Sequence, residues 1–486
     1  MRSGFVLIAV ASAALAGCSL APPYERPSTP APASYKESPT AQATWFPAAP
    51  ADELDRGPWW KLFGDPVLSG LVEKVEVSNQ NVAAAVAQYA EAQALVGEAR
   101  AALFPTLSLN ASATRAGGGG GGRTSQARAS GNSFDGSLAA SWEPDVWGRL
   151  RDAVTSAQAN AQASAATLAG AKLSAQAAVA TNYFALREAD NEITLLTAAV
   201  DAYARSLKIT QNQYNVGIAQ RTDVLQAQTQ LETTQANLVS TVGQRARLEH
   251  AIAILVGKAP GDFSIAPAPW NMTVPAIPLT VPSDLLQRRP DIAAAERAVA
   301  SANAQIGIAR AGYFPSFGLT ASDGAVATTL PALFRASSNV WSLGLSVAQT
   351  IFDAGATAAK VQAARASRDV AIANYRGAVL TAFQSVEDQL SSLRALAEQE
   401  GARRAASADA DRTEQLTLNQ YLQGQVPYTT VVTAQVTALT ARQTLSQLES
   451  SRQAAAIALI QALGGGWQAQ EPIAAAGHPT TASGLH

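Results

Sequence analysis

The sequence has few of the residues on which most protein chemistry depends. Its 486 residues include one cysteine, two methionines and three histidines, and only 15% are charged. A lone cysteine cannot form a disulfide within the chain, so packing must hold the fold together. His250, His478 and His486 have no acid or cysteine at the spacing of a catalytic triad or a metal site. We therefore expect no enzyme activity, no metal and no noncovalent cofactor.

The net charge and the lengths of the apolar runs limit which partners the chain can have. A formal net charge of −2 argues against a generally basic protein that binds nucleic acid. Residues 5–16 form an apolar run of about 12 residues, which is too short to cross a bilayer and has the length of a signal-peptide core. No later segment offers about 18 unbroken apolar residues. If this chain spans a membrane, it must do so as a β-barrel.

The apolar run ends in Leu-Ala-Gly-Cys at residues 15–18, which resembles the lipobox of a bacterial lipoprotein. Residues 1–17 are then a signal peptide, and Cys18 carries a diacylglycerol thioether and an N-acyl group. Two or more acyl chains give stable anchoring, whereas one gives marginal binding. Ser19 in place of aspartate favours, by resemblance to known lipoproteins, sorting to the outer membrane. An ordinary secretory signal with a chance cysteine is the alternative.

Two halves of the chain share one plan. Residues 99–106 (ARAALFPT) return 210 positions later as residues 309–316 (ARAGYFPS), and residues 212–217 (NQYNVG) return 207 positions later as residues 419–424 (NQYLQG). Ordered matches at a near-constant offset indicate a duplication rather than coincidence in a chain rich in alanine and glutamine. The predicted segments are a proline-rich tether (18–58), a first repeat (59–258), an inter-repeat segment (259–282), a second repeat (283–464) and a C-terminal segment (465–486).

Each repeat is predicted to contain a helix, two strands, a long helix, a turn and another helix. The long helices have almost no proline. In the helices after the turns, apolar residues recur at the seven-residue spacing of coiled coils, as at Leu231 and Leu238 and again at Val432 and Leu439. The helices are expected at about 66–103, 149–214, 223–256, 283–311, 356–421 and 430–463, and the strands at 106–114, 133–142, 316–322 and 340–347.

The four predicted strands alternate between apolar and small polar residues, as transmembrane strands do. In the first strand Leu107 and Leu109 point to one face, and Ser108 and Asn110 to the other. A soluble sheet with one face on a core is the alternative. Four strands leave two unpaired edges, which lipid does not tolerate, so copies of the chain must complete a barrel. Two copies give eight strands with a filled interior, so three copies are the smallest number that leaves a duct.

The residues 288–297 (RRPDIAAAER), continued by 306–315 (IGIARAGYFP), resemble a hallmark of the TolC-like outer-membrane efflux factors, and most closely their lipid-anchored NodT/OprM branch. Residues 59–66 (WWKLFGDP) resemble the entry to that branch's first helix. The resemblance implies a mainly α fold with a β-barrel part, in a homotrimer whose four strands per chain complete a twelve-strand barrel. It also implies coiled-coil helices that form an α-barrel tunnel across the periplasm, and an equatorial belt.

The same resemblance implies a function and partners. The expected function is the exit duct of a tripartite efflux pump, which passively conducts drugs or other small molecules. A periplasmic adaptor, an inner-membrane pump of the resistance–nodulation–division class and outer-membrane lipid are the implied partners, with no nucleic acid. A duct for protein secretion and a structural coiled-coil envelope lipoprotein are the two alternatives.

In this family the helix pairs that turn at the periplasmic end constrict the tunnel. The resemblance places a gate at Tyr214, Gly217, Thr222 and Asp223 in the first repeat, and at Tyr421, Gly424, Val426, Thr430 and Thr433 in the second. A threonine–aspartate pair at the position of Thr222 and Asp223 is tied in relatives to a tyrosine matching Tyr421. Asp223 has the alternative of capping a helix. Relatives carry acids or an arginine near Val426, so we expect a gate that depends on Tyr421, Asp223 and apolar packing by Val426.

Overall fold

The computed structural model describes residues 19–29, 32, 34–37, 57–117, 131–270, 272–275, 277 and 288–465. The predicted lipid site at Cys18, the predicted signal peptide, His478, His486 and nearly all of the predicted C-terminal segment lie outside these residues. The chain folds into two compact units, each assembled from three stretches of sequence. We call residues 1–29, 87–165 and 294–378 the sheet unit, and residues 30–86, 166–293 and 379–486 the helical unit.

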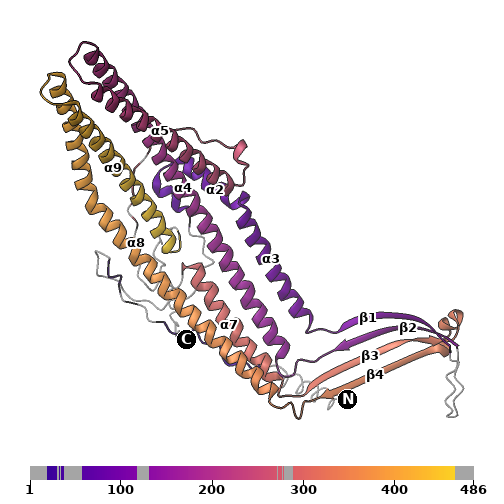
Figure 1. Ribbon diagram of the computed structural model, residues 1–486. Coiled ribbons are helices and arrows are strands. Elements are labelled where there is room, and N and C mark those ends of the chain that lie inside the picture. Colours follow the sequence, from indigo (N-terminus) through magenta and orange to yellow (C-terminus); the bar gives the residue numbers. More distant parts are fainter. Residues whose placement is uncertain are drawn as a thin grey trace, which may run out of the picture. The chain divides into compact units, whose positions relative to one another are not determined.

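The sheet unit holds four antiparallel strands that pair in the order of the sequence, β1-β2-β3-β4 (Figure 1). Each strand covers the predicted segment and extends it by a few residues. The bounds are Thr106–Ala116 for β1, Gly131–Trp142 for β2, Ser316–Ala327 for β3 and Asn339–Ala348 for β4, with the short helices η3 (Leu330–Phe334) and η4 (Ala336–Ser338) between β3 and β4. Strands β1 and β4 are the two edges of the sheet.

The strand register places the predicted apolar residues of all four strands on one face. Leu107 pairs with Ala140, which pairs with Ala321, which in turn pairs with Leu343. Directly opposed residues share a face in an antiparallel sheet, so these four side chains form one row across it. The next row belongs to the other face and is polar, with Ser322 opposite Ser342 and a distance of 2.8 Å between their hydroxyl oxygens.

The helices repeat in the predicted order. The first repeat has η1 (Trp59–Phe63), α2 (Pro66–Ser78), α3 (Gln80–Ala101), α4 (Arg149–Asn215) and α5 (Arg221–Leu255), followed by η2 (Pro260–Asp262); the second has α7 (Pro290–Ala311), α8 (Ala356–Leu422) and α9 (Tyr428–Ala462). Helices α4 and α8 are each 67 residues long. The predicted fold class, mainly α with a four-stranded sheet, is confirmed. The predicted start of the second repeat, from residue 283 to residue 287, lies outside the described residues.

The single helix predicted over residues 66–103 is wrong, because the chain breaks at Asn79. This residue has an extended backbone, with φ −71° and ψ 124°. Its side-chain oxygen accepts hydrogen bonds from the backbone N–H groups of Asn81 and Val82, and its amide donates to the carbonyl of Leu255 over 2.7 Å. Asn79 therefore starts α3 as an N-cap, and asparagine is one of the favoured residues at that position.

The helical unit has an apolar core that includes Trp59, Phe63 and Phe184. Asp65 begins α2 by accepting hydrogen bonds from the N–H groups of the first turn, and it also accepts one from the hydroxyl of Tyr183 over 2.6 Å. These contacts give residues 59–66, singled out in the sequence, a structural role: they seat the start of the first repeat on the long helix α4.

Within the helical unit, α4 and α9 run antiparallel and are joined by side chains along their length. Gln461 donates to Ser174 near one end, Asn191 donates to Ser446, and the hydroxyl of Tyr203 donates to the carbonyl of Gln435 over 3.2 Å. Helix α4 belongs to the first repeat and α9 to the second. The two repeats are therefore interlocked rather than separate.

In the sheet unit, residues 19–29 form an extended strap. Ser19 donates to the buried carboxylate of Asp152 over 2.7 Å, Arg310 donates to the carbonyl of Leu20 over 3.0 Å, and the carbonyl of Pro22 accepts from Asn303 over 2.7 Å. The strap thus binds both α4 and α7, beginning one residue after Cys18. The sequence predicted a tether here but not these contacts.

Candidate gate at the two helical turns

The two turns at which the long helices reverse have the same backbone geometry. Gly217 follows α4 with φ +79°, and Gly424 follows α8 with φ +73°. In each turn the glycine N–H bonds the carbonyl three residues earlier, and the next N–H bonds the carbonyl five residues earlier. This pattern is a Schellman motif, whose left-handed position favours glycine. The two glycines therefore shape both turns.

Tyr421 is buried at the second turn and reaches the other repeat. It is 8% exposed, and its hydroxyl donates to Oε1 of Gln213 on α4 over 2.5 Å. The same hydroxyl lies 3.5 Å from Oγ1 of Thr210. The ring of Tyr421 lies 5.2 Å from that of Tyr428, the first residue of α9. One buried tyrosine thus joins the turns of the two repeats.

An apolar cluster surrounds Tyr421. Its buried members are Ala227, Tyr421, Tyr428 and Val431, and Val426 packs against it. Burial raises the pKa of Tyr428 to about 12, and the neighbouring Tyr421 adds to the effect. Burial also raises the pKa of Tyr421. Both rings are therefore neutral at physiological pH and hold the turns by packing and by hydrogen bonds rather than by charge.

Asp223 caps its own helix in the structure. Its carboxylate accepts from the backbone N–H of Gln220 over 3.1 Å, while the side chain of Gln220 accepts from the N–H of Asp223. This reciprocal pair is a capping box. Thr222 is exposed and donates to the side chain of Gln220 over 3.3 Å. Within the described residues no hydrogen bond joins Asp223 to Tyr421, so their link stays a prediction.

The other predicted gate residues lie at the surface of the single chain. Tyr214 is 39% exposed, and Thr430 and Thr433 are exposed. Thr433 donates to the carbonyl of Thr429 within its helix over 3.0 Å. These side chains are available to other copies or to the contents of a duct.

Sequence reasoning missed three residues that contact Tyr421, which are Thr210, Gln213 and Tyr428. The signal for Gln213 was present, because it belongs to the repeated Asn-Gln-Tyr run that pointed to Tyr421. Tyr428 stands at the start of α9, where the sequence placed a turn. That the first repeat supplies the acceptor for a tyrosine of the second could not be read from either repeat alone.

The described residues contain no group of three or more histidine, cysteine, aspartate or glutamate side chains that could hold a metal ion. His250 lies exposed on α5.

Among the helices of the described segments, none is both long enough and apolar enough to cross a membrane.

Comparison with known proteins identifies the family. The outer membrane efflux protein family matches residues 71–258 and 281–465. The chain is 30% identical over 483 residues to the probable efflux pump outer membrane protein SepC of Pseudomonas putida, covering 98% of this chain and 100% of that one. It is also 30% identical over 462 residues to the cation efflux system protein CusC of Escherichia coli, covering 94% and 97%.

Solved structures agree with this assignment. The outer-membrane channel OprN superposes with a TM-score of 0.83 at 28% identity, covering 93% of this chain and 100% of that one. A structure of CusC superposes with a TM-score of 0.80 at 28% identity, covering 92% and 100%. The chain belongs to the outer membrane efflux protein family. It resides in the outer membrane and serves as the exit duct of an efflux system.

Proposed function

We propose that three copies of this chain assemble into a closed duct, with the four strands of each copy forming one third of a twelve-strand barrel. The supporting observation is the sheet itself, which is apolar on one face and polar on the other, and whose edge strands β1 and β4 have no partner strand among the described residues. Such a sheet is stable in lipid only when its edges are paired. The polar face then lines the duct and the apolar face meets lipid.

The turns at Gly217 and Gly424 form the gate of this duct. The cluster around Tyr421 holds the turns of the two repeats together within a copy, and Asp223, Thr430 and Thr433 stand where neighbouring copies meet. A closed state needs the turns to stay packed, and an open state needs them to separate. The Tyr421–Gln213 bond is one polar contact at the turns that must break for the turns to separate.

The duct works with a periplasmic adaptor and an inner-membrane pump of the resistance–nodulation–division class, and Cys18 carries the lipid that fixes it to the outer membrane. Its cargo is small molecules. The relatives are named for toluene, cation and antibiotic efflux, a diversity that suits a duct whose pump selects the substrate. A protein-secretion duct would instead associate with an ATP-driven exporter.

Single-channel conductance in planar bilayers tests the gate. Wild type is expected to conduct little, and Asp223→Ala and Tyr421→Ala to conduct more. If neither variant exceeds wild type, the gate lies elsewhere. Cross-linking to the adaptor and drug susceptibility in a deletion strain test the partners and the cargo. Recovery of an ATP-driven secretion exporter in place of the pump would reject the efflux assembly.

A further inference from the structure

The points where strands meet helices carry exposed aromatic side chains. Phe104 precedes β1, Trp142 ends β2, Phe314 precedes β3 and Phe352 follows β4, and they are 67%, 39%, 38% and 87% exposed. Aromatic residues gather where a membrane protein passes from hydrocarbon to water. These four side chains mark the level at which the sheet of this outer-membrane protein enters the bilayer from the periplasmic side.

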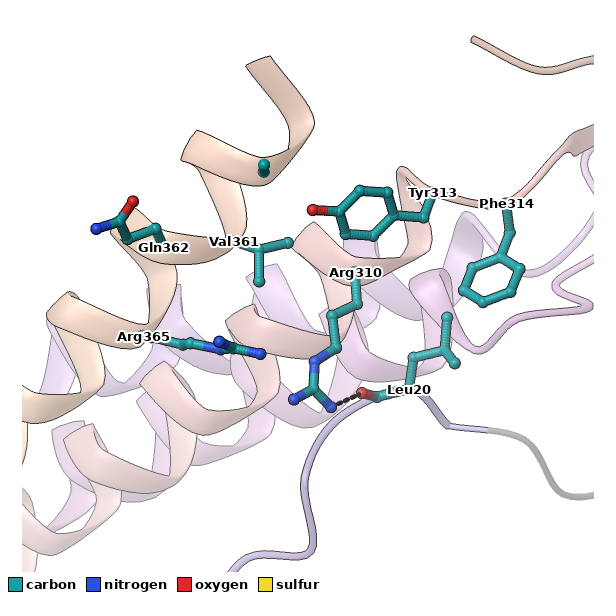
Figure 2. Close-up of a pocket in the computed structure, with 8 residues that line it drawn as sticks. Leu20, Arg310, Tyr313, Phe314, Val361, Gln362 and Arg365 are labelled. Carbon is teal, nitrogen blue, oxygen red and sulfur yellow. Dashed lines mark hydrogen bonds between the residues drawn. The ribbon is translucent and has the colours of Figure 1, made fainter. Parts of the chain in front are cut away.

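A pocket opens at this level in the sheet unit. It has a volume of about 820 Å³ and is bounded by the end of α7, the start of α8 and the strap (Figure 2). Its lining residues are Leu20, Arg310, Tyr313, Phe314, Ala358, Val361, Gln362 and Arg365. The strap contributes Leu20, two residues after the predicted lipid site. The pocket therefore opens on the face along which the strap runs toward its anchor.

The charge of the pocket is unbalanced. Arg310 and Arg365 line it, and none of its described lining residues carries a carboxylate. Arg310 donates one N–H to the carbonyl of Leu20. A guanidinium group has five N–H donors, so most of them remain available to a ligand. Arg365 is exposed and makes no hydrogen bond or ion pair with any residue that the structure describes. In Figure 2 the two side chains extend toward one another, an arrangement that an anion between them would stabilise.

The walls of the pocket are apolar. Val361, one turn before Arg365 on α8, is 6% exposed, and Leu20 and Phe314 add to the apolar lining. An anion alone would gain nothing from these side chains. A ligand with a phosphate at one end and hydrocarbon at the other would contact both the guanidinium groups and the walls.

We propose that this pocket binds the head group of an anionic glycerophospholipid from the periplasmic leaflet of the outer membrane. Arg310 and Arg365 contact the phosphate, with the forked geometry that guanidinium groups offer to phosphate oxygens. The acyl chains leave past Phe314 toward the hydrocarbon. A zwitterionic head group fits less well, because its cation would find no carboxylate in the pocket. The site would fix the depth of the duct in the membrane beside its covalent anchor.

Native mass spectrometry of the full-length protein with phosphatidylglycerol tests this proposal. One tightly bound phosphatidylglycerol per chain is expected, with phosphatidylcholine weaker. Arg365→Gln is the informative variant. The side chain of Arg365 makes no hydrogen bond or ion pair with the described residues, so its loss should leave the fold intact. It should weaken phosphatidylglycerol binding by about tenfold, the scale of one charge-assisted hydrogen bond. Arg365→Lys, which keeps the charge but not the fork, should recover only part of the affinity. Arg403→Gln, which changes another exposed arginine of α8, should change nothing.

Two results would overturn the proposal. One is equal phosphatidylglycerol affinity in Arg365→Gln and Arg403→Gln, which would move lipid binding away from this pocket. The other is displacement of phosphatidylglycerol by inorganic phosphate at millimolar concentration, which would make the pocket a site for free anions. Arg310→Gln should weaken binding as well, and it should also loosen the strap, because it removes the bond to Leu20.

Discussion

The hydroxyl of Tyr421 donates to Oε1 of Gln213 across 2.5 Å, and this bond joins the second repeat of the chain to the first. The two residues lie on α8 and α4, each one or two residues before the end of its helix. They belong to the same repeated Asn-Gln-Tyr run, so two copies of one ancestral segment supply a donor in one case and an acceptor in the other.

A double-mutant cycle tests whether this bond keeps the duct closed. Tyr421→Phe keeps the ring and removes the hydroxyl, and Gln213→Leu removes the acceptor. Each should raise the open probability about fivefold, since a net hydrogen bond is worth about 1 kcal/mol. The double variant should add little to either single one. Gln211→Leu is the control, because Gln211 bonds Asn215 on the same helix rather than α8. Additive effects in single-channel recordings would show that the bond does not couple the repeats.

The raised pKa values of the buried tyrosines predict how the turns respond to pH. A folded pKa near 12, against an ordinary value of 10.0, means that the neutral ring of Tyr428 is favoured in the folded chain. Its contribution to stability is complete below pH about 10 and is lost as the pH rises through about 12. The ultraviolet tyrosinate difference between wild type and Tyr428→Phe should show a midpoint near 12. A midpoint near 10 would mean that the ring is exposed.

Gly307 permits the strap to lie against α7. A Cβ at this position would overlap Oδ2 of Asp152 and lie 2.7 Å from the backbone nitrogen of Ala21. Gly307→Ala should therefore displace the strap and speed chymotrypsin cleavage after Tyr24. Gly377→Ala is the matched control, because among the described residues no atom outside the backbone of its own helix lies within 4 Å of its Cβ. It should leave cleavage unchanged and stabilise α8 by about 0.5–1 kcal/mol. Equal cleavage rates in the two variants would contradict the role of Gly307.

A buried ion cluster stabilises the helical unit. Asp190 accepts from Arg187 over 2.9 Å and from Arg245 over 2.5 Å, and their side chains are 6%, 4% and 13% exposed. Asp190→Asn would leave two buried guanidinium groups without their shared carboxylate, at a cost of about 3–5 kcal/mol. Thermal unfolding in detergent should show a clear drop in midpoint. Asp201→Asn, an exposed site on the same helix, should not. If the two variants have the same midpoint of thermal unfolding, the cluster contributes little to stability.

The two faces of β4 should respond oppositely to the same change. Leu343 lies on the apolar face in a row with Ala321, and its neighbour Ser342 lies on the polar face. Leu343→Arg would place a charge in lipid, at about 2–4 kcal/mol per chain near the middle of the bilayer. It should reduce the amount of assembled protein in the outer membrane. Ser342→Arg should assemble normally and alter conductance instead. The opposite pattern would mean that the apolar face lines the duct and the polar face meets lipid.

Much of this fold follows from the periodicity of apolar residues in the sequence and from where proline is absent. The strands alternate with a period of two, and the long helices contain almost no proline, so both were predicted within a few residues. The break at Asn79 was missed because its cause is tertiary: the side chain caps one helix and bonds Leu255 far along the chain. The sequence alone offers an asparagine in a helical pattern, which is a weak signal.

The candidate gate was predicted less completely. Gly217 and Gly424 predict the two turns, since the left-handed position after a helix favours glycine. The position of Tyr421 came from the repeat and from family resemblance. Its acceptor Gln213 and the ring of Tyr428 depend on how two repeats pack, and no local pattern encodes that packing. The strap contacts of Ser19 and Leu20 escaped prediction for the same reason.

The order of the four strands has a genetic consequence. The edges of the sheet differ, since β1 belongs to the first repeat and β4 to the second, so copies must join head to tail, β4 of one to β1 of the next. A copy with one damaged edge can still pair through the other and would leave the ring open. In a cell that makes equal amounts of intact and damaged chains, only about one trimeric ring in eight would be free of damaged copies. Edge-strand alleles of this protein should therefore be dominant.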